Sequence, residues 1–352
     1  MRPMCARRRQ VELQGDNKMK ITKSNAMLMA AAMLSAVTMV ACGGGGDGSS
    51  TPAAGAAATS TPASSATPAS GASATSTSQP GTLDTSNYAA GTSERAAFDL
   101  INQYRTQCGF PALKQNTILD QAARNHAAYE AANNTVTDDE IAGKTGFTGV
   151  TGADRAKALG WPSNVFTGSA DGGVSGTSDP TQIGQQAVLA FMSVPYHSLT
   201  VPINSTDVGL GFAQAPFSVM DSLHVGGTLA TIAGAPLTLP CQGSTGIPYQ
   251  GNGENPTPPG VTWPVGTPIA VMSNLNDTVR LTSGTIRGPD GSPIVLQLLD
   301  GSIDSTIGNY EAVAYPKTPL KSSTQYSVTL QGTVNGTQFT RAFSFTTGTF
   351  GA

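Results

Sequence analysis

Apolar residues recur at helical spacing in two early segments of the chain. Between residues 92 and 107 they return every three or four positions, which predicts a helix that Thr92 or Ser93 caps and that ends before Gly109. The same periodicity over residues 117–133 predicts a second helix, with His126 on its apolar stripe. A histidine in such a stripe is usually a buried, hydrogen-bonded core residue rather than a catalytic one.

Capping signals mark two further helices. Thr151 and Asp154 have the spacing of a capping box, so a short helix begins there and ends at Gly160. The next helix follows Asp179-Pro180 and ends before Pro195, because the residue that precedes a proline avoids helical geometry. His197 is therefore expected on the loop that leaves this helix.

The apolar period changes to two after residue 207. "VGLGFAQ", "FSVMDSLHV" and "LTLPC" predict three strands, so the helices should enclose a small sheet. His224 lies in the second of these strands, where we expect it at the surface, with pairing to Asp221 as the alternative. A Pro/Gly-rich linker at 246–265 precedes residues 266–349, whose short strand patterns predict an immunoglobulin-like β-sandwich. The predicted fold class is α+β, followed by an all-β domain.

Composition changes abruptly near the N-terminus. Residues 43–82 consist almost entirely of Gly, Ala, Ser, Thr and Pro, so we expect residues 43–91 to be a disordered linker ahead of a domain at 92–245. The formal net charge is -3, and no run of Lys or Arg occurs outside the extreme N-terminus. These features exclude the basic surface that nucleic-acid binding needs.

Residues 1–42 are expected to be an N-terminal extension followed, from Met19, by an export signal. Basic residues at 19–23 precede an apolar run at 26–40 that is short for a membrane span, and Ala41, Cys42 and Gly43 follow. This arrangement resembles the signal of bacterial lipoproteins, in which the cysteine becomes the lipidated first residue. We therefore expect an exported protein anchored through Cys42 at the outer membrane or cell surface. The alternative is a plain signal peptide and a secreted or periplasmic protein.

Two cysteines remain in the part of the chain that should fold. In an oxidising compartment, Cys108 and Cys241 most simply form one disulfide. Two separately buried thiols are the alternative.

Several blocks of the sequence together resemble the CAP superfamily of cysteine-rich secretory, antigen 5 and pathogenesis-related proteins. They are "LINQYRTQCGFPALKQNTILDQAARNHAAYEAANN", "GFTGVTGADRAKALGW", "VPYHS" and "DVGLGF" followed by "FSVMD", and they span residues 94–240. The resemblance implies an α-β-α sandwich. It also implies a cleft lined by two histidines and two acidic residues, which binds zinc in some members, while others carry sterols or fatty acids.

The cleft residues are only partly present in this chain. His197 occupies the position of one family histidine, and Glu140 that of one acid. Asp138 stands where the second histidine would be. Thr167 stands near the place of the second acid, and the nearest carboxylate is Asp171, in a glycine-rich stretch whose path the sequence does not reveal.

This residue set predicts weak metal chemistry at best. One imidazole with the carboxylates of Asp138 and Glu140 is a poor zinc site, and an oxygen-rich site would hold calcium only weakly. A clear nucleophile is missing, as are the Gly-x-Ser-x-Gly and His-Glu-x-x-His motifs. The structural alternative is that His197 packs on Tyr196 and that residues 138–140 form a solvated acidic turn.

The sequence thus favours a non-catalytic binding or structural protein at the cell envelope. We expect no cofactor, a monomer, a membrane contact through the lipid anchor, and an envelope polymer, a lipid or a protein as partner. One alternative is a metal-dependent hydrolase that uses His197 and Glu140. The other is a lipid or sterol carrier.

Overall fold

The computed structural model describes residues 78–229 and 231–352. The described residues belong to one compact unit. The predicted signal segment, Cys42 and the linker up to residue 77 lie outside the described residues. Within the described ranges, no helix combines the length and the apolar character that a membrane span requires.

Four α-helices form where apolar periodicity and capping signals predicted them. Thr92 accepts a hydrogen bond from the backbone of Arg95 at the first helix, and Thr151 and Asp154 form the predicted capping box at the third. Pro180 occupies the first turn of the fourth helix, and His197 begins the short 3-10 turn after it. The bounds are α1, Ser93–Gln107; α2, Thr117–Asn133; α3, Gly152–Ala158; α4, Pro180–Ser193; and η1, His197–Leu199.

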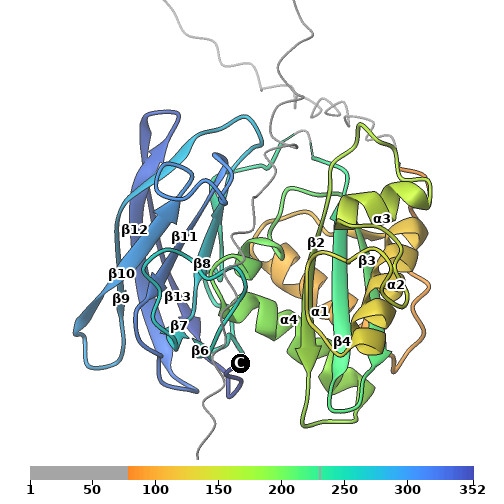
Figure 1. The fold of residues 1–352 in the computed structure, drawn as a ribbon. Coiled ribbons are helices and arrows are strands. Elements are labelled where there is room, and N and C mark those ends of the chain that lie inside the picture. The colour runs from red at the N-terminus through yellow and green to blue at the C-terminus, as the bar shows by residue number, and fades with distance from the viewer. Residues whose placement is uncertain (1–77, 230) are drawn as a thin grey trace, which may run out of the picture. The chain divides into compact units, whose positions relative to one another are not determined.

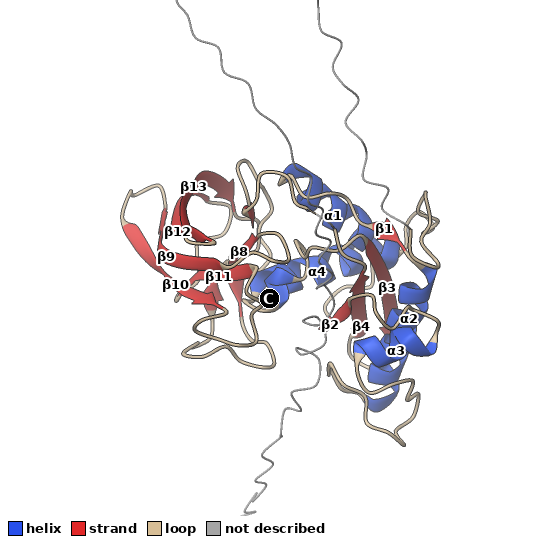
Figure 2. Cartoon of the chain, turned by 90° about the horizontal axis from the view of Figure 1, so that it is seen from above, coloured by secondary structure: helices blue, strands red, loops and turns tan. Residues whose placement is uncertain are grey.

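A four-stranded sheet lies between these helices, in the order β1-β3-β4-β2. The strands are β1, Lys114–Gln115; β2, Thr167–Val174; β3, Asp207–Gln214; and β4, Val219–Gly226. Figures 1 and 2 show α2 and α3 on one face and α1 and α4 on the other. This is the α-β-α sandwich that the family resemblance implied.

The edge strand β2 was not predicted. Its sequence, TGSADGGV, has no alternation of apolar and polar residues, because an edge strand rich in glycine buries few side chains. In the structure it pairs along its full length with β4, and Asp171 lies opposite Ser222. The glycine-rich stretch is therefore a strand, and Asp171 has a fixed place in the sheet.

Two glycines in β3 allow α2 to pack directly on the sheet. A Cβ atom on Gly209 would lie 2.0 Å from the backbone carbon of Leu119, and one on Gly211 would lie 2.2 Å from that of Ala123. Both distances are far below van der Waals contact. The glycines of "VGLGF" are therefore needed for the close approach of α2 to β3, and they do not form a turn.

A curled antiparallel sheet follows in the C-terminal region, in the order β13-β12-β9-β10-β11-β8-β5 (Figure 1). Its strands are β5, Leu237–Leu239; β8, Ile269–Met272; β9, Val279–Arg287; β10, Pro293–Asp300; β11, Glu311–Pro316; β12, Gln325–Val334; and β13, Thr337–Thr346. Strands β6, Gln250–Gly251, and β7, Val265–Gly266, form a separate pair. The all-β region agrees with the predicted fold class.

One strand belongs to a different sheet from the one predicted. We expected "LTLPC" to complete the sheet between the helices, but β5 pairs with β8, with Thr238 opposite Val271. The alternating pattern reveals that a segment is a strand and says nothing about which neighbour supplies its hydrogen bonds. The strand exchange places β5 in the C-terminal sheet, although it precedes the predicted domain boundary at residue 245.

The predicted disulfide is present. Cys108, at the end of α1, is bonded to Cys241, which follows β5, and the two Cα atoms lie 5.4 Å apart. The bond therefore joins the helical layer to the start of the C-terminal region. Tyr196, beside η1, makes a further connection by donating a hydrogen bond to Asp304.

Candidate functional site

A cavity of about 260 Å³ opens beside the edge strand β2 and the end of α4. Its charged and imidazole lining comes from four separate segments of the chain. These are the turn after α2, β2, η1 and the segment between β6 and β7, which contribute Asp138, Asp171, His197 and Glu254. The cavity therefore collects residues that lie far apart in the sequence.

His197 is held by Glu254 rather than by Glu140. The ring Nδ1 lies 2.8 Å from Glu254 Oε2, and the same carboxylate accepts hydrogen bonds from the backbone N–H groups of Tyr196 and His197. The ring stacks on Phe191 of α4, with centroids 5.8 Å apart, and not on Tyr196 as the structural alternative proposed. Burial lowers the pKa of His197, but the hydrogen bond and charge of Glu254 outweigh it, so the pKa is raised above its ordinary value.

Glu254 gave no signal in the sequence. It lies in the stretch at 246–265 that we predicted to be a linker, and its side chain is only 1% exposed. A charged residue in a Pro/Gly-rich stretch has no periodic pattern around it. Only the strand pair β6–β7 brings it to His197.

Glu140 belongs to a different environment. It is buried and accepts hydrogen bonds from the backbone N–H groups of Thr148 and Gly149 and from the Thr148 hydroxyl. It also lies 3.0 Å from Nδ1 of His126. The predicted trio of His197, Glu140 and Asp138 is thus divided: Asp138 shares the cavity with His197, whereas Glu140 pairs with His126. Residues 138–140 are not a wholly solvated turn.

An acidic residue of β2 also lines the cavity. Asp171 lines the cavity beside His197, whereas Thr167, which stood near that place in the sequence, lies at the far end of the strand. Burial raises the pKa of Asp171 above its ordinary value, and the charge of His126 opposes that shift. The chain therefore has an aspartate in the cavity that the sequence alone had left without a position.

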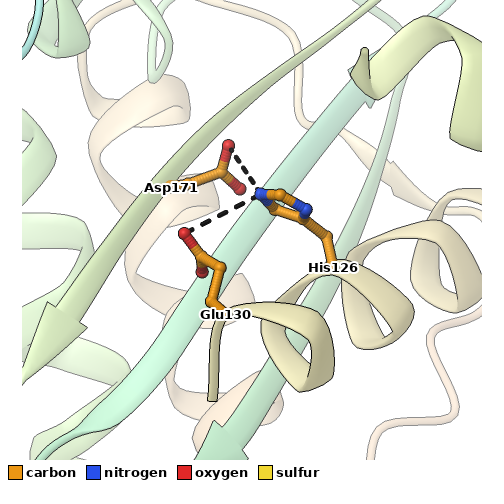
Figure 3. Close-up of side chains that lie close together, drawn as sticks. All are labelled: His126, Glu130 and Asp171. Carbon is orange, nitrogen blue, oxygen red and sulfur yellow. Dashed lines mark ion pairs between the residues drawn. The ribbon is translucent and has the colours of Figure 1, made fainter. Parts of the chain in front are cut away.

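A buried cluster adjoins the cavity through Asp171. His126 and Glu130 leave successive turns of α2 and point toward Asp171 on β2 (Figure 3). His126 Nε2 lies 3.8 Å from Glu130 Oε1 and 3.5 Å from Asp171 Oδ2, and all three side chains are 0% exposed. His126 is thus a buried, hydrogen-bonded core residue, as predicted, but it is surrounded by carboxylates.

Two ionisable residues of β4 are buried. His224 is 0% exposed, so the expectation of a surface position was wrong. Its strand lies inside the sheet and helices cover both faces, so burial lowers the pKa of the ring well below its ordinary value. Asp221 lies opposite Gly172 of β2, and burial raises its pKa to about 7. Residues three apart in a strand point to opposite faces of the sheet, so Asp221 and His224 do not pair.

The cavity does not fit the zinc site of the family. It has one imidazole, His197, and the ring Nδ1 is already bonded to Glu254. A second nitrogen or sulfur ligand is missing from its described lining. Zinc prefers sites that offer several such ligands, so the cavity is a poor zinc site.

The comparison with protein families agrees with this architecture. Residues 98–220 match the model of the cysteine-rich secretory protein (CAP) family. Among solved structures, an outer surface protein from Borrelia burgdorferi is similar with 14% sequence identity and a TM-score of 0.32, covering 42% of this chain and 98% of that chain. None of the curated proteins matches the sequence.

Proposed function

This chain is a CAP-like protein, with its CAP domain at residues 98–220, and from that premise we propose that it is an exported binding protein. Its cavity beside His197 would take a small cationic group, such as an ammonium or guanidinium. The observation that carries the proposal is the charge of the lining: three carboxylates accompany one imidazole. They belong to Asp138, Asp171 and Glu254.

The charge balance favours a cation. None of the described lining residues is Lys or Arg, so the cavity stays negative even when His197 is protonated. Carboxylates accept charge-assisted hydrogen bonds from ammonium and guanidinium groups, and these bonds are stronger than bonds between neutral groups. Asp138 is exposed, so its carboxylate is accessible to a ligand that enters from solvent.

The lining also favours binding over chemistry. Its only described hydroxyl groups belong to Thr137 and Ser193, and the Ser193 hydroxyl donates a hydrogen bond to the carbonyl oxygen of Ala190. A serine used in this way is not activated by a base. An acidic lining also suits an acyl chain or a sterol poorly, because apolar ligands require an apolar pocket.

A hydrolase is the second candidate, and one observation favours it. Glu254 orients the His197 ring in the way that a carboxylate orients a general base. Replacing His197 by alanine separates the two candidates. Loss of a hydrolytic activity with unchanged thermal stability would support the hydrolase, and unchanged behaviour would support the binding protein.

The ligand class is tested by isothermal titration with putrescine and arginine methyl ester, with butanol as the uncharged comparison. We expect Asp138→Asn to weaken binding of both cations about tenfold, because one exposed carboxylate is lost. Asp139→Asn is the matched control, since Asp139 is also exposed and is not among the lining residues. Equal binding of butanol, or equal loss in the two variants, would overturn the proposal.

Anchoring at the cell envelope is part of the same proposal. It rests on the signal-like segment that ends at Cys42. We expect the protein to partition into detergent-extracted membranes and Cys42→Ser to release it into the soluble fraction. A protein that is soluble with and without this change would instead be secreted or periplasmic.

A further inference from the structure

The geometry points to a divalent transition-metal site on His126, Glu130 and Asp171, separate from the His197–Glu254 pair. The sequence predicted no cofactor, and the candidate ligands that it named were others. This site therefore extends beyond the proposed function of the cavity. Four observations support it.

The first observation is the spacing of the ligand atoms. His126 Nε2, a Glu130 oxygen and an Asp171 oxygen all lie within 4.8 Å of one another. The two distances from Nε2 are 3.8 and 3.5 Å. Zinc bonds of about 2.0–2.2 Å in tetrahedral geometry separate neighbouring ligand atoms by roughly 3.3–3.6 Å. A small contraction would bring these three groups around one ion.

The second observation is that Glu140 fixes the ring of His126. Its carboxylate lies 3.0 Å from Nδ1, and Thr148 and Gly149 hold that carboxylate in place. Histidines that bind metal commonly donate their other ring N–H to a carboxylate in this way. The arrangement leaves Nε2 facing Glu130 and Asp171 (Figure 3).

The third observation is a set of buried polar atoms without hydrogen-bond partners. Among the described residues, both carboxylate oxygens of Asp171 and Oε2 of Glu130 are in this state. Buried polar atoms are rarely left unpaired. A cation between the two carboxylates would satisfy several of these atoms at once.

The fourth observation is that the cluster lies next to the cavity. Asp171 and Thr137 line the cavity and also contact His126, so the cluster lies directly behind the cavity wall. The Thr137 carbonyl oxygen lies 2.7 Å from His126 Nε2, so a metal ion would take the place of this hydrogen bond.

The ligand chemistry selects the kind of ion. One imidazole with two carboxylates suits Mn²⁺ better than Zn²⁺, because carboxylate oxygens are ligands that Mn²⁺ prefers and the site offers only one nitrogen. Calcium takes six to eight oxygen ligands, which three side chains do not supply.

The test uses the full chain, stripped with a chelator and then titrated with Zn²⁺ alone and with Mn²⁺ alone. We expect one Mn²⁺ ion per chain to remain after dialysis, by elemental analysis. Glu130→Gln should weaken binding by about a hundredfold, because the amide keeps the side-chain size and removes the charge. The matched control is Glu254→Gln, which makes the same change at the other histidine and should leave metal binding unchanged.

Thermal melts in chelator show whether the Glu130→Gln protein is folded. If it is not, pulsed electron paramagnetic resonance of Mn²⁺ on the unaltered chain should show coupling to one imidazole nitrogen, and His197→Gln should not remove it. The proposed site would be overturned if the unaltered chain bound no stoichiometric metal. It would also be overturned if Glu254→Gln abolished metal binding and Glu130→Gln did not. The titrations with putrescine and arginine methyl ester are run in chelator. The cation-binding cavity and the metal site are therefore tested separately, and one can be refuted without the other.

Discussion

The carboxylate of Glu254 accepts hydrogen bonds from the backbone N–H and from the ring of His197, at 3.1 and 2.8 Å. One acidic side chain therefore fixes both the main chain and the imidazole of the residue after α4. Burial alone would lower the pKa of this ring, and Glu254 reverses the direction.

Glu254→Gln should lower the pKa of His197, because the change removes the largest of the effects that raise it. A proton NMR titration measures this directly, since the chain contains only three histidines. Asp139→Asn serves as the control, because it removes one exposed charge without touching the ring. A His197 pKa that shifts equally in both variants would contradict the specific role of Glu254.

The same pair predicts the pH dependence of stability. A histidine whose folded pKa is raised stabilises the protein below its unfolded pKa of about 6.5, and this contribution is lost as the pH rises through the folded value. Glu254→Gln should therefore reduce the free energy of unfolding more at about pH 5 than at about pH 9. Urea titrations at the two pH values measure the difference, and an equal loss at both would show that the ion pair does not carry it.

Asp221 should act in the opposite sense to an ordinary surface aspartate. Burial raises its pKa to about 7, so the protein loses stability as the pH rises from about 4 to 7, because the unfolded chain releases this proton while the folded protein still holds it. Asp221→Asn should increase the free energy of unfolding at about pH 8 by on the order of 3 kcal/mol and have little effect at about pH 3. Asp290→Asn, at an exposed turn, is the control. A pH-independent effect would refute this explanation.

The candidate site was harder to predict than the fold. His197, Asp138 and Glu140 were selected as polar residues of the family's cleft motifs, but local spacing cannot reveal which carboxylate reaches which imidazole. Glu254 comes from a segment without periodic pattern, and Asp171 from a glycine-rich edge strand. Both are positioned by strand pairings that join distant parts of the chain.

Removing the disulfide should destabilise the protein substantially. Cys108 and Cys241 are 133 residues apart, and closing a loop of that length contributes about 4 to 5 kcal/mol in the chain-entropy treatment. The paired change of both cysteines to serine should lower the free energy of unfolding by about that amount in urea. Reductant should destabilise the unaltered protein and leave the double variant unaffected. Equal sensitivity to reductant would contradict the prediction.

Gly211→Ala should separate α2 from the sheet. The added Cβ would lie 2.2 Å from the backbone of Ala123, so the helix must move, at an expected cost of about 2 kcal/mol or more in stability. Gly253→Ala is the control, because no atom lies within 4 Å of its added Cβ. Thermal unfolding measures both, and similar melting temperatures would show that the helix adjusts freely.

The helices and most strands could be predicted from local pattern because each has its own signal. Caps at Thr92, Thr151 and Asp179 set the helix starts, and alternation marks strands such as β12. The strand β2 lacked alternation, and the partner of β5 depends on contacts far away in the sequence. Local sequence therefore predicts where helices and strands lie, whereas the order of strands in a sheet depends on contacts between distant residues.

The exchange of β5 into the C-terminal sheet has a practical consequence for anyone who wishes to divide this molecule. A fragment cut at residue 245 would carry away an edge strand that belongs to its neighbour and leave behind the acid that fixes His197. Neither half would be a self-sufficient module. A fusion of either region to another protein would have to keep β5 with the C-terminal sheet and Glu254 with His197. The two regions are therefore best kept together in one chain.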